Sequence, residues 1–175
     1  MHKTLILIDC QKDFIFGALA NPEAQKKVPA IAEFAKNFDG PVVMTRDSHD
    51  EDYLNTQEGR NLPIVHCIMN TDGWNIDESI FDSVYETHDP NDIWLVDKDT
   101  FGYDGWGHIK DVWLADEIHV AGFVTDICVV SNVLVLKAMF PETKIVLHAD
   151  LCAGLTPEKH EAALEVMRSC QVEVI

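Results

Sequence analysis

The sequence predicts an α/β domain in which a doubly wound parallel sheet lies between layers of helices. Short apolar, β-branched runs recur along the chain, stretches with helical spacing separate several of them, and 47% of the 175 residues are hydrophobic. This length falls within the roughly 100 to 200 residues of one domain, and this apolar content can supply one core. We therefore expect a single domain over residues 1–175, with no linker.

Six runs have the length and composition of buried strands. They are Thr4–Ile8, Pro41–Thr45, Ile93–Val96, Ile118–Ala121, Lys144–His148 and Val172–Ile175. Between them, residues 28–35 and 162–167 repeat apolar side chains at helical spacing, and Thr156 offers an N-cap oxygen to the second of these helices. Alternation of strand and helix is typical of a parallel sheet covered on both faces.

The stretch from Arg46 to about Asp92 interrupts this alternation. It is rich in Asp, Asn, Glu and Gly, and it is longer than an ordinary connection in a compact domain. We expect a functional loop here, with a short helical piece near residues 79–86.

Charge and cysteine content argue against several classes of protein. The chain has 30 acidic and 13 basic residues and a formal charge of −17, which disfavours nucleic acid and anionic membranes as partners. Five cysteines without a C-x-x-C spacing fit neither a disulfide framework nor a zinc knuckle. No run approaches the ~18 apolar residues of a membrane span, and the first residues do not resemble a signal peptide. We expect a cytoplasmic protein with reduced thiols and a small-molecule ligand.

Three reactive side chains follow predicted strands. Asp9 ends the first run, Lys98 follows the third, and Cys128 lies just after the fourth. The ligand crevice of an open parallel sheet lies beyond the carboxyl ends of its strands, so these side chains can meet at one edge. A carboxylate can take the proton of a thiol that attacks a carbonyl carbon, and a lysine can stabilise the charges involved. The set predicts a hydrolase with Cys128 as nucleophile.

The residues around Cys128 and Asp9 allow further expectations and alternatives. Asp126 can cap a helix that begins at Cys128, and a helix N-terminus lowers the pKa of a thiol. Cys10 would point away from Asp9 if the strand continued, so packing is its expected role. A phosphatase of the haloacid dehalogenase type would need a second Asp where Gln11 stands. Taken singly, a strand-end Asp is often a turn residue and a buried Cys a packing residue.

The polar loop contains a candidate metal site. Asp47 and His49 are two residues apart and can face the same side of an extended segment. Glu58 and His66 can complete a set of oxygen and nitrogen ligands, which suits zinc, iron or manganese better than calcium. The alternative interpretation is a solvated acidic loop.

Three segments together resemble the isochorismatase-like cysteine hydrolases, within them the nicotinamidase branch. DCQKDF at 9–14 is similar to the opening motif of the family, VDKDTF at 96–101 to its lysine segment, and GFVTDICV at 122–129 to its nucleophile segment. The resemblance spans nearly the whole chain and implies a Rossmann-like, three-layer αβα fold with a six-stranded parallel sheet. It also implies a triad of Asp9, Lys98 and Cys128, and a cis peptide bond before Val124. The N–H groups of Val124 and Cys128 would form an oxyanion hole, Phe14 would line the substrate pocket, and the chain would form a homo-oligomer as many members do.

The same resemblance bears on the metal and the substrate. Nicotinamidases bind a divalent metal through an Asp-x-His pair, a later His and, in some members, a Glu, an order that Asp47, His49, Glu58 and His66 follow. Many members have a second His where this chain offers Tyr53, Asn55 or Glu58. The implied reaction is hydrolysis of nicotinamide or a related carboxamide through a thioester on Cys128. The alternatives are an isochorismatase or N-carbamoyl-amide hydrolase, and a non-catalytic α/β module that holds a metal.

Overall fold

The computed structural model describes all 175 residues and contains one six-stranded sheet. The strand order is β3-β2-β1-β4-β5-β6, and every neighbouring pair is parallel. The strands are β1 (Lys3–Ile8), β2 (Val42–Asp47), β3 (Ile93–Lys98), β4 (Glu117–Phe123), β5 (Lys144–Ala153) and β6 (Glu173–Val174). Each of the six predicted runs overlaps one strand, so the predicted doubly wound parallel sheet is confirmed.

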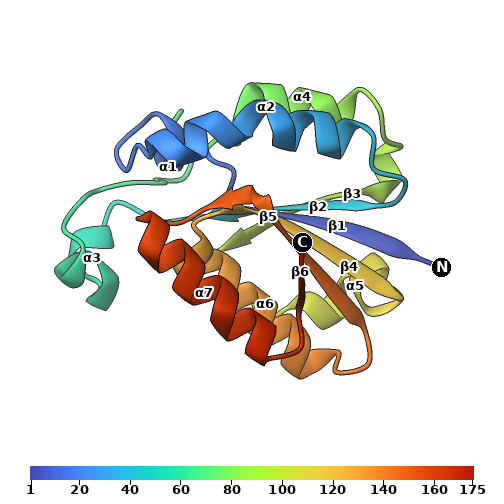
Figure 1. Ribbon diagram of the computed structural model, residues 1–175. Helices are drawn as coiled ribbons and strands as arrows, with labels where there is room; N and C mark the ends of the chain where they lie inside the picture. The colour runs from blue at the N-terminus through green and yellow to red at the C-terminus, as the bar shows by residue number, and fades with distance from the viewer.

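Helices cover both faces of the sheet and give three layers (Figure 1). They are α1 (Lys12–Ile15), α2 (Pro22–Lys36), α3 (Gln57–Asn61), α4 (Glu78–Tyr85), α5 (Lys110–Trp113), α6 (Val130–Met139) and α7 (Pro157–Ser169). Helices α2 and α4 pack on one face of the sheet, and α5, α6 and α7 pack on the other. Each face has one buried apolar cluster, to which its helices contribute. None of the helices combines the length and the apolar composition needed to cross a bilayer.

Side-chain caps explain where the two long helices on opposite faces begin. Asn21 precedes α2, and its Oδ1 accepts the N–H groups of Glu23 and Ala24 at 2.9 and 3.3 Å. The predicted cap of the last helix is confirmed, because Thr156 Oγ1 accepts the Lys159 N–H at 3.2 Å. These bonds satisfy N–H groups that the first turn of a helix leaves without a partner.

The direction of strand addition reverses between β1 and β4, which creates a topological switch point. From β1 the chain adds β2 and then β3 on one side, whereas β4, β5 and β6 follow one another on the other side. Ligand crevices of open α/β sheets lie at such a point, beyond the carboxyl ends of the strands. The crevice expected here lies beyond β1 and β4.

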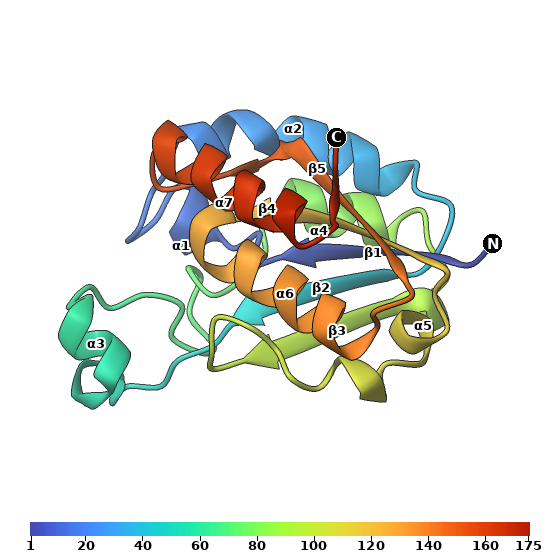
Figure 2. The ribbon, with the colours of Figure 1, turned by 60° about the horizontal axis from the view of Figure 1, so that its bottom comes forward.

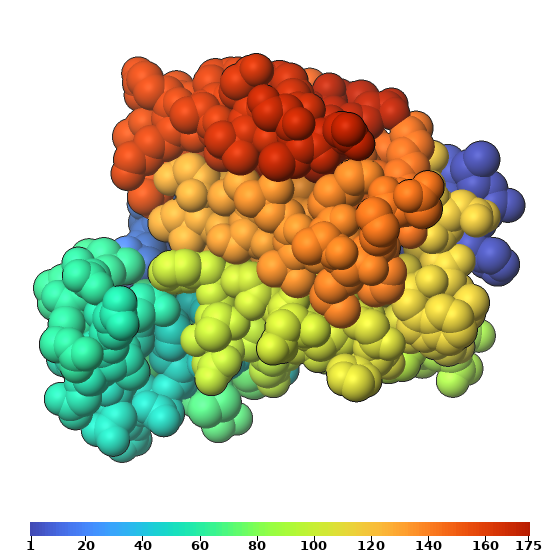
Figure 3. All heavy atoms as spheres, turned by 90° about the horizontal axis from the view of Figure 1, so that it is seen from below, coloured from blue at the N-terminus to red at the C-terminus, as the bar shows by residue number.

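The segment between β2 and α4 projects past this edge of the sheet. It contains a 3₁₀ turn at Tyr53–Asn55 and the short helix α3, and Figure 2 shows it extending from the end of β2. In Figure 3 it forms a lobe at one end of the molecule, next to the segment around residue 100. An isolated bridge between His49 and Ile68 joins two parts of the segment, and a second bridge, between Gln11 and Ile76, ties it to the residues that follow β1.

Candidate active site

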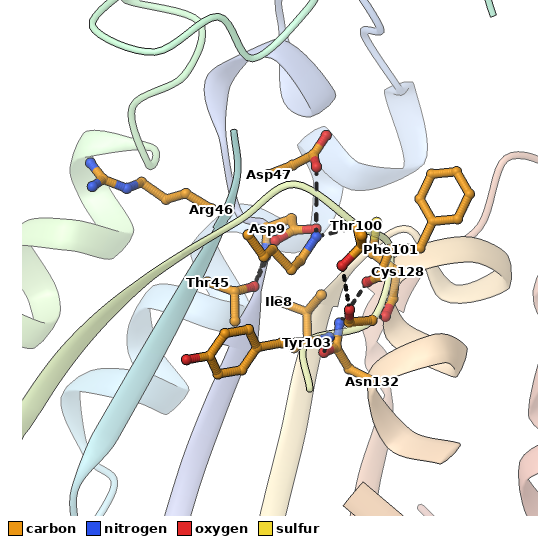
Figure 4. Close-up of polar contacts among 12 residues, drawn as sticks. Ile8, Asp9, Thr45, Arg46, Asp47, Thr100, Phe101, Tyr103, Cys128 and Asn132 are labelled. Carbon is orange, nitrogen blue, oxygen red and sulfur yellow. Dashed lines mark hydrogen bonds and ion pairs between the residues drawn. The ribbon is translucent and has the colours of Figure 1, made fainter. Parts of the chain in front are cut away.

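The ends of four neighbouring strands supply four buried polar side chains. Asp9 follows β1, Asp47 and Lys98 are the last residues of β2 and β3, and Cys128 lies just after β4. Lys98 Nζ is 2.7 Å from Asp9 Oδ2 and 3.8 Å from both Cys128 Sγ and Asp47 Oδ1. Figure 4 shows Asp9, Asp47 and Cys128 at the same end of the sheet. The structure thus brings together the three residues that the sequence placed at strand ends.

Burial and the charge of Asp9 favour the protonated, thiol form of Cys128. Burial raises the pKa of Cys128 well above its ordinary value, and the charge of Asp9 raises it further, while the Lys98 ammonium acts in the opposite direction. Burial also raises the pKa of Asp9, against the lowering effect of Lys98. A carboxyl with a raised pKa is suited to take a proton and return it.

The expected helix beginning at Cys128 with Asp126 as its cap is wrong. Residues Thr125–Val129 form a π-helical turn that precedes α6, and no side chain caps that turn. Asp126 Oδ1 instead accepts the Leu155 N–H at 2.8 Å. The predicted lowering of the thiol pKa is also wrong, since burial and the charge of Asp9 raise that pKa. The peptide bond between Phe123 and Val124, just before this turn, is cis.

Four side chains of the projecting segment and β2 form a compact set of potential metal ligands. Asp47, His49, Glu58 and His66 each place one ligand atom within 4.8 Å of the other three. Asp47 Oδ2 is 3.0 Å from His49 Nε2 and 3.5 Å from His66 Nε2. Glu58 Oε1 is 3.6 Å from His49 Nε2 and 3.9 Å from His66 Nε2. Ligand atoms bound tetrahedrally at about 2.1 Å from one ion lie roughly 3.4 Å apart, so the observed spacing fits a divalent metal.

The hydrogen bonds around the four residues favour the same conclusion. His66 Nδ1 donates to the Ile64 carbonyl oxygen at 2.7 Å, which leaves Nε2 as the nitrogen available to a metal. Burial works to raise the pKa of Asp47, but the side-chain contacts with His49 and His66 and the charge of Lys98 outweigh it and hold that pKa well below its usual range. Asp47 is therefore ionised, as a metal ligand must be.

The structure also distinguishes among the three candidates for the fourth ligand. Glu58 lies in the cluster, whereas the Tyr53 hydroxyl donates to the Leu62 carbonyl oxygen at 2.9 Å. Asn55 is exposed and its amide donates to Asp52 at 3.1 Å. The Tyr53 ring instead packs 4.6 and 4.9 Å, centroid to centroid, from the two histidine rings of the cluster.

One cavity connects the thiol with the potential metal ligands. It has a volume of about 490 Å³, and its lining is mostly apolar. Cys128 lies on this lining, and so do three of the four cluster residues, Asp47, Glu58 and His66. Phe14, which the resemblance placed in the substrate pocket, also lines it and meets the His66 ring edge-on at 5.7 Å between centroids. A flat apolar molecule with one polar end can reach both the sulfur and the cluster from here.

Two buried polar side chains that hold Asp9 and Asp47 were missed as functional residues in the sequence. Gln11 Oε1 accepts the Asp47 N–H at 2.7 Å, and its Nε2 donates to the carbonyl oxygens of Asp47 and Trp74 at 2.8 and 2.9 Å. Thr45 forms two hydrogen bonds with Asp9. In the sequence, Gln11 is only a letter of the opening motif and Thr45 only a β-branched strand residue. Their burial beside charged groups was the missing signal.

Asn132 was missed for the same reason, since it lies within the apolar helix α6. Its Nδ2 donates to the carbonyl oxygens of Phe101 and Cys128 at 2.9 and 2.8 Å, and its Oδ1 accepts the Tyr103 N–H at 2.8 Å. Both N–H groups of its side-chain amide thus donate, and Oδ1 accepts one hydrogen bond. Asn132 therefore joins the nucleophile turn to the segment that follows Lys98.

Comparisons with known proteins agree with this geometry. A family model described as Isochorismatase domain matches residues 3–175. The isochorismatase family protein PncA of Bacillus subtilis is 31% identical over 94% of this chain and 93% of its own length. The nicotinamidase/pyrazinamidase of Mycobacterium tuberculosis is 28% identical over 99% of this chain and 98% of its own length. The crystal structure of pyrazinamidase of Pyrococcus horikoshii in complex with zinc is similar to this structure, with a TM-score of 0.80. The match covers 100% of this chain and 99% of that one, with 27% sequence identity.

Proposed function

The chain belongs to the isochorismatase family, and on that premise we propose that it is a cysteine-dependent amidohydrolase of the nicotinamidase type. Its substrate would be nicotinamide or a closely related aromatic carboxamide, and its products the acid and ammonia. The observation that carries this proposal is the shared cavity, because the Cys128 thiol and three of the four potential metal ligands, Asp47, Glu58 and His66, line the same mostly apolar space. Named nicotinamidases among the similar proteins support the same substrate class.

Acylation uses the residues at the switch point. Asp9 accepts the proton of the Cys128 thiol as the sulfur attacks the carboxamide carbon. The backbone N–H groups of Val124 and Cys128 donate to the oxygen that becomes negatively charged. The C–N bond then breaks, Asp9 returns its proton to the leaving nitrogen, and ammonia departs from a thioester on Cys128. Lys98, whose Nζ lies 2.7 Å from Asp9 Oδ2, supplies the positive charge that pairs with this carboxylate.

Deacylation reverses the proton path. Asp9 takes a proton from a water molecule that attacks the thioester carbon, and the same two N–H groups donate to the carbonyl oxygen. The C–S bond breaks, the proton on Asp9 passes to the sulfur, and the carboxylic acid leaves. Asp9 thus serves as base and then as acid in each half of the reaction.

Asp47, His49, Glu58 and His66 would hold a divalent metal such as zinc, iron or manganese. When bound, the metal would supply a Lewis-acid contact for a ring nitrogen of the substrate, which positions the carboxamide rather than activating water. Phe14 would pack against the ring from the cavity wall.

Replacement of the nucleophile tests the mechanism. Cys128→Ala is expected to abolish ammonia release from nicotinamide, while Cys10→Ala is expected to retain it, because Cys10 is buried in the apolar cluster under α2 and α4. The parent and the two variants are compared by mass spectrometry after a brief reaction. Only the parent and Cys10→Ala can carry an acyl group on Cys128. Full activity of Cys128→Ala would rule out the mechanism.

A substrate panel tests the branch of the family. Nicotinamide, pyrazinamide and an N-carbamoyl amino acid are assayed for ammonia release, and isochorismate for pyruvate release, each with and without a chelator. We expect turnover of the two aromatic amides and its loss with the chelator. Preference for the N-carbamoyl compound or isochorismate, unaffected by the chelator, would overturn the nicotinamidase assignment and leave the cysteine mechanism intact.

A further inference from the structure

The hydroxyl of Thr45 contacts both the backbone and the side chain of Asp9. Thr45 lies on β2 and is completely buried. Its Oγ1 donates to Asp9 Oδ1 at 2.6 Å and accepts the Asp9 N–H at 3.1 Å. Figure 4 shows the Thr45 side chain directed at Asp9, and a dashed line marks the hydrogen bond from its hydroxyl to the Asp9 carboxylate. A threonine hydroxyl has one proton to donate, and here that proton goes to the carboxylate.

The backbone of Asp9 explains why such a contact is needed. The parallel ladder between β1 and β2 ends at the pair Leu7 and Met44. Asp9 then leaves the strand with φ of 47°, in the left-handed region that residues other than glycine rarely adopt. Its N–H therefore lacks a ladder partner, and the Thr45 hydroxyl supplies one from the side. The same hydroxyl fixes the direction in which the side chain leaves this bend.

The carboxylate of Asp9 is consequently held at both oxygens. Thr45 contacts Oδ1, and the Lys98 ammonium lies 2.7 Å from Oδ2. Lysine is a flexible chain with a compact charge, which attracts the carboxylate without fixing its plane. The threonine hydroxyl is attached close to a rigid strand, so it supplies the directional bond that defines the plane.

We propose that Thr45 is the positioning residue for the general base, an inference that rests on the proposed role of Asp9. Asp9 must take a proton from Cys128 and return it to nitrogen without rotating away between the two transfers. Geometric errors of about 1 Å in such an arrangement reduce rates about 100-fold. Thr45 prevents that rotation, and it acts through Asp9 without touching the substrate.

Two variants separate the hydroxyl from the rest of the side chain. Thr45→Val keeps the size and branching of the residue and removes the hydroxyl, whereas Thr45→Ser keeps the hydroxyl and removes the methyl group. With nicotinamide as substrate, we expect Thr45→Val to lower kcat roughly 10- to 100-fold with little change in KM, as for loss of a hydrogen bond to a charged group. Thr45→Ser is expected to stay within about threefold of the parent in both constants.

A second measurement works without turnover. Iodoacetamide labelling at pH 7 is followed by peptide mass spectrometry, with the exposed Cys170 as reference within the same molecule. We expect Thr45→Val to slow alkylation of Cys128 relative to Cys170, and Thr45→Ser not to. Unfolding midpoints in urea verify that each variant is folded under the assay conditions.

The outcomes distinguish this inference from the proposed function. An unchanged kcat in Thr45→Val, or an equal loss in Thr45→Ser and Thr45→Val, would overturn the positioning role while Cys128→Ala remained inactive. Activity that survived in Cys128→Ala would overturn the mechanism itself, and the role of Thr45 with it. A drop in kcat confined to Thr45→Val, with slowed alkylation of Cys128, supports both.

Discussion

Replacement of Lys98 by methionine is expected to destabilise the fold strongly, because it removes the buried counter-charge of Asp9. Lys98 is 4% exposed and Asp9 is completely buried, so water cannot take over the role of the ammonium. At 2.7 Å, with an effective dielectric constant of about 20, the attraction between the two charges is about 6 kcal/mol. Desolvation offsets part of this gain, and loss of one partner of a buried pair typically costs about 3 to 5 kcal/mol.

The cost of Lys98→Met depends on pH in a direction that the charges define. Without Lys98, burial and the nearby charge of Asp47 raise the pKa of Asp9 further, and only the hydrogen bond from Thr45 still acts to lower it. A carboxyl whose pKa is higher in the folded than in the unfolded chain destabilises the fold at pH values above its unfolded pKa. The effect disappears as the pH falls and Asp9 is protonated in both states. The deficit of the variant is therefore larger at pH 7.5 than at pH 5.

Urea unfolding followed by far-UV circular dichroism in buffer with a chelator measures this deficit. The double variant Lys98→Met/Asp9→Asn removes both charges and is expected to recover most of the lost stability. Lys26→Met, which breaks an exposed pair with Glu23 at 2.6 Å, is the surface control and should leave the midpoint unchanged. A double variant as unstable as Lys98→Met, with no dependence on pH, would show that lost packing and not an unpaired charge is responsible.

Two further predictions concern metal affinity and acid stability. Gln11→Leu removes the amide that holds the backbone of Asp47, and zinc affinity measured by competition with a chromogenic chelator is expected to fall 10- to 100-fold; unchanged affinity would contradict this role. Burial and the charge of His119 lower the pKa of His148 to about 4. The contribution of neutral His148 to the free energy of unfolding is therefore fully present above pH 6.5 and is lost as the pH falls toward 4. His148→Phe should therefore reduce the drop in urea midpoint between pH 7 and pH 5, and an equal drop in both proteins would refute it.

The sequence predicted the sheet well because its strands are apolar runs with polar boundaries. Boundaries were less accurate where a strand ends in charged residues. Strand β2 continues to Asp47 and β3 to Lys98, although neither residue favours a strand. Those last residues are the ones that carry the chemistry, so the predicted strands stopped just short of the site. The meeting of Asp9, Lys98 and Cys128 could still be predicted, because it follows from the parallel order of the strands.

The parts of the site that the sequence did not reveal depend on contacts between distant segments. Nothing local in the sequence tells that Thr45 faces Asp9 or that Gln11 reaches the end of β2, since both contacts require the register of neighbouring strands. The N-cap assigned to Asp126 failed for a related reason. Its carboxylate found a partner in Leu155, and that tertiary bond prevailed over the local preference for a cap.

The proposed metal also accounts for the convergence of three carboxylates where only one lysine is buried. Asp9, Asp47 and Glu58 oppose the single charge of Lys98, which leaves two negative charges unbalanced when both histidines of the cluster are neutral. Burial and the charge of Asp47 raise the pKa of Glu58, so its negative charge is poorly compensated by the protein alone. Excess charge away from water is costly, and the chain without metal reduces it by binding protons. A divalent cation carries the two positive charges that remove the excess, so metal uptake should release protons.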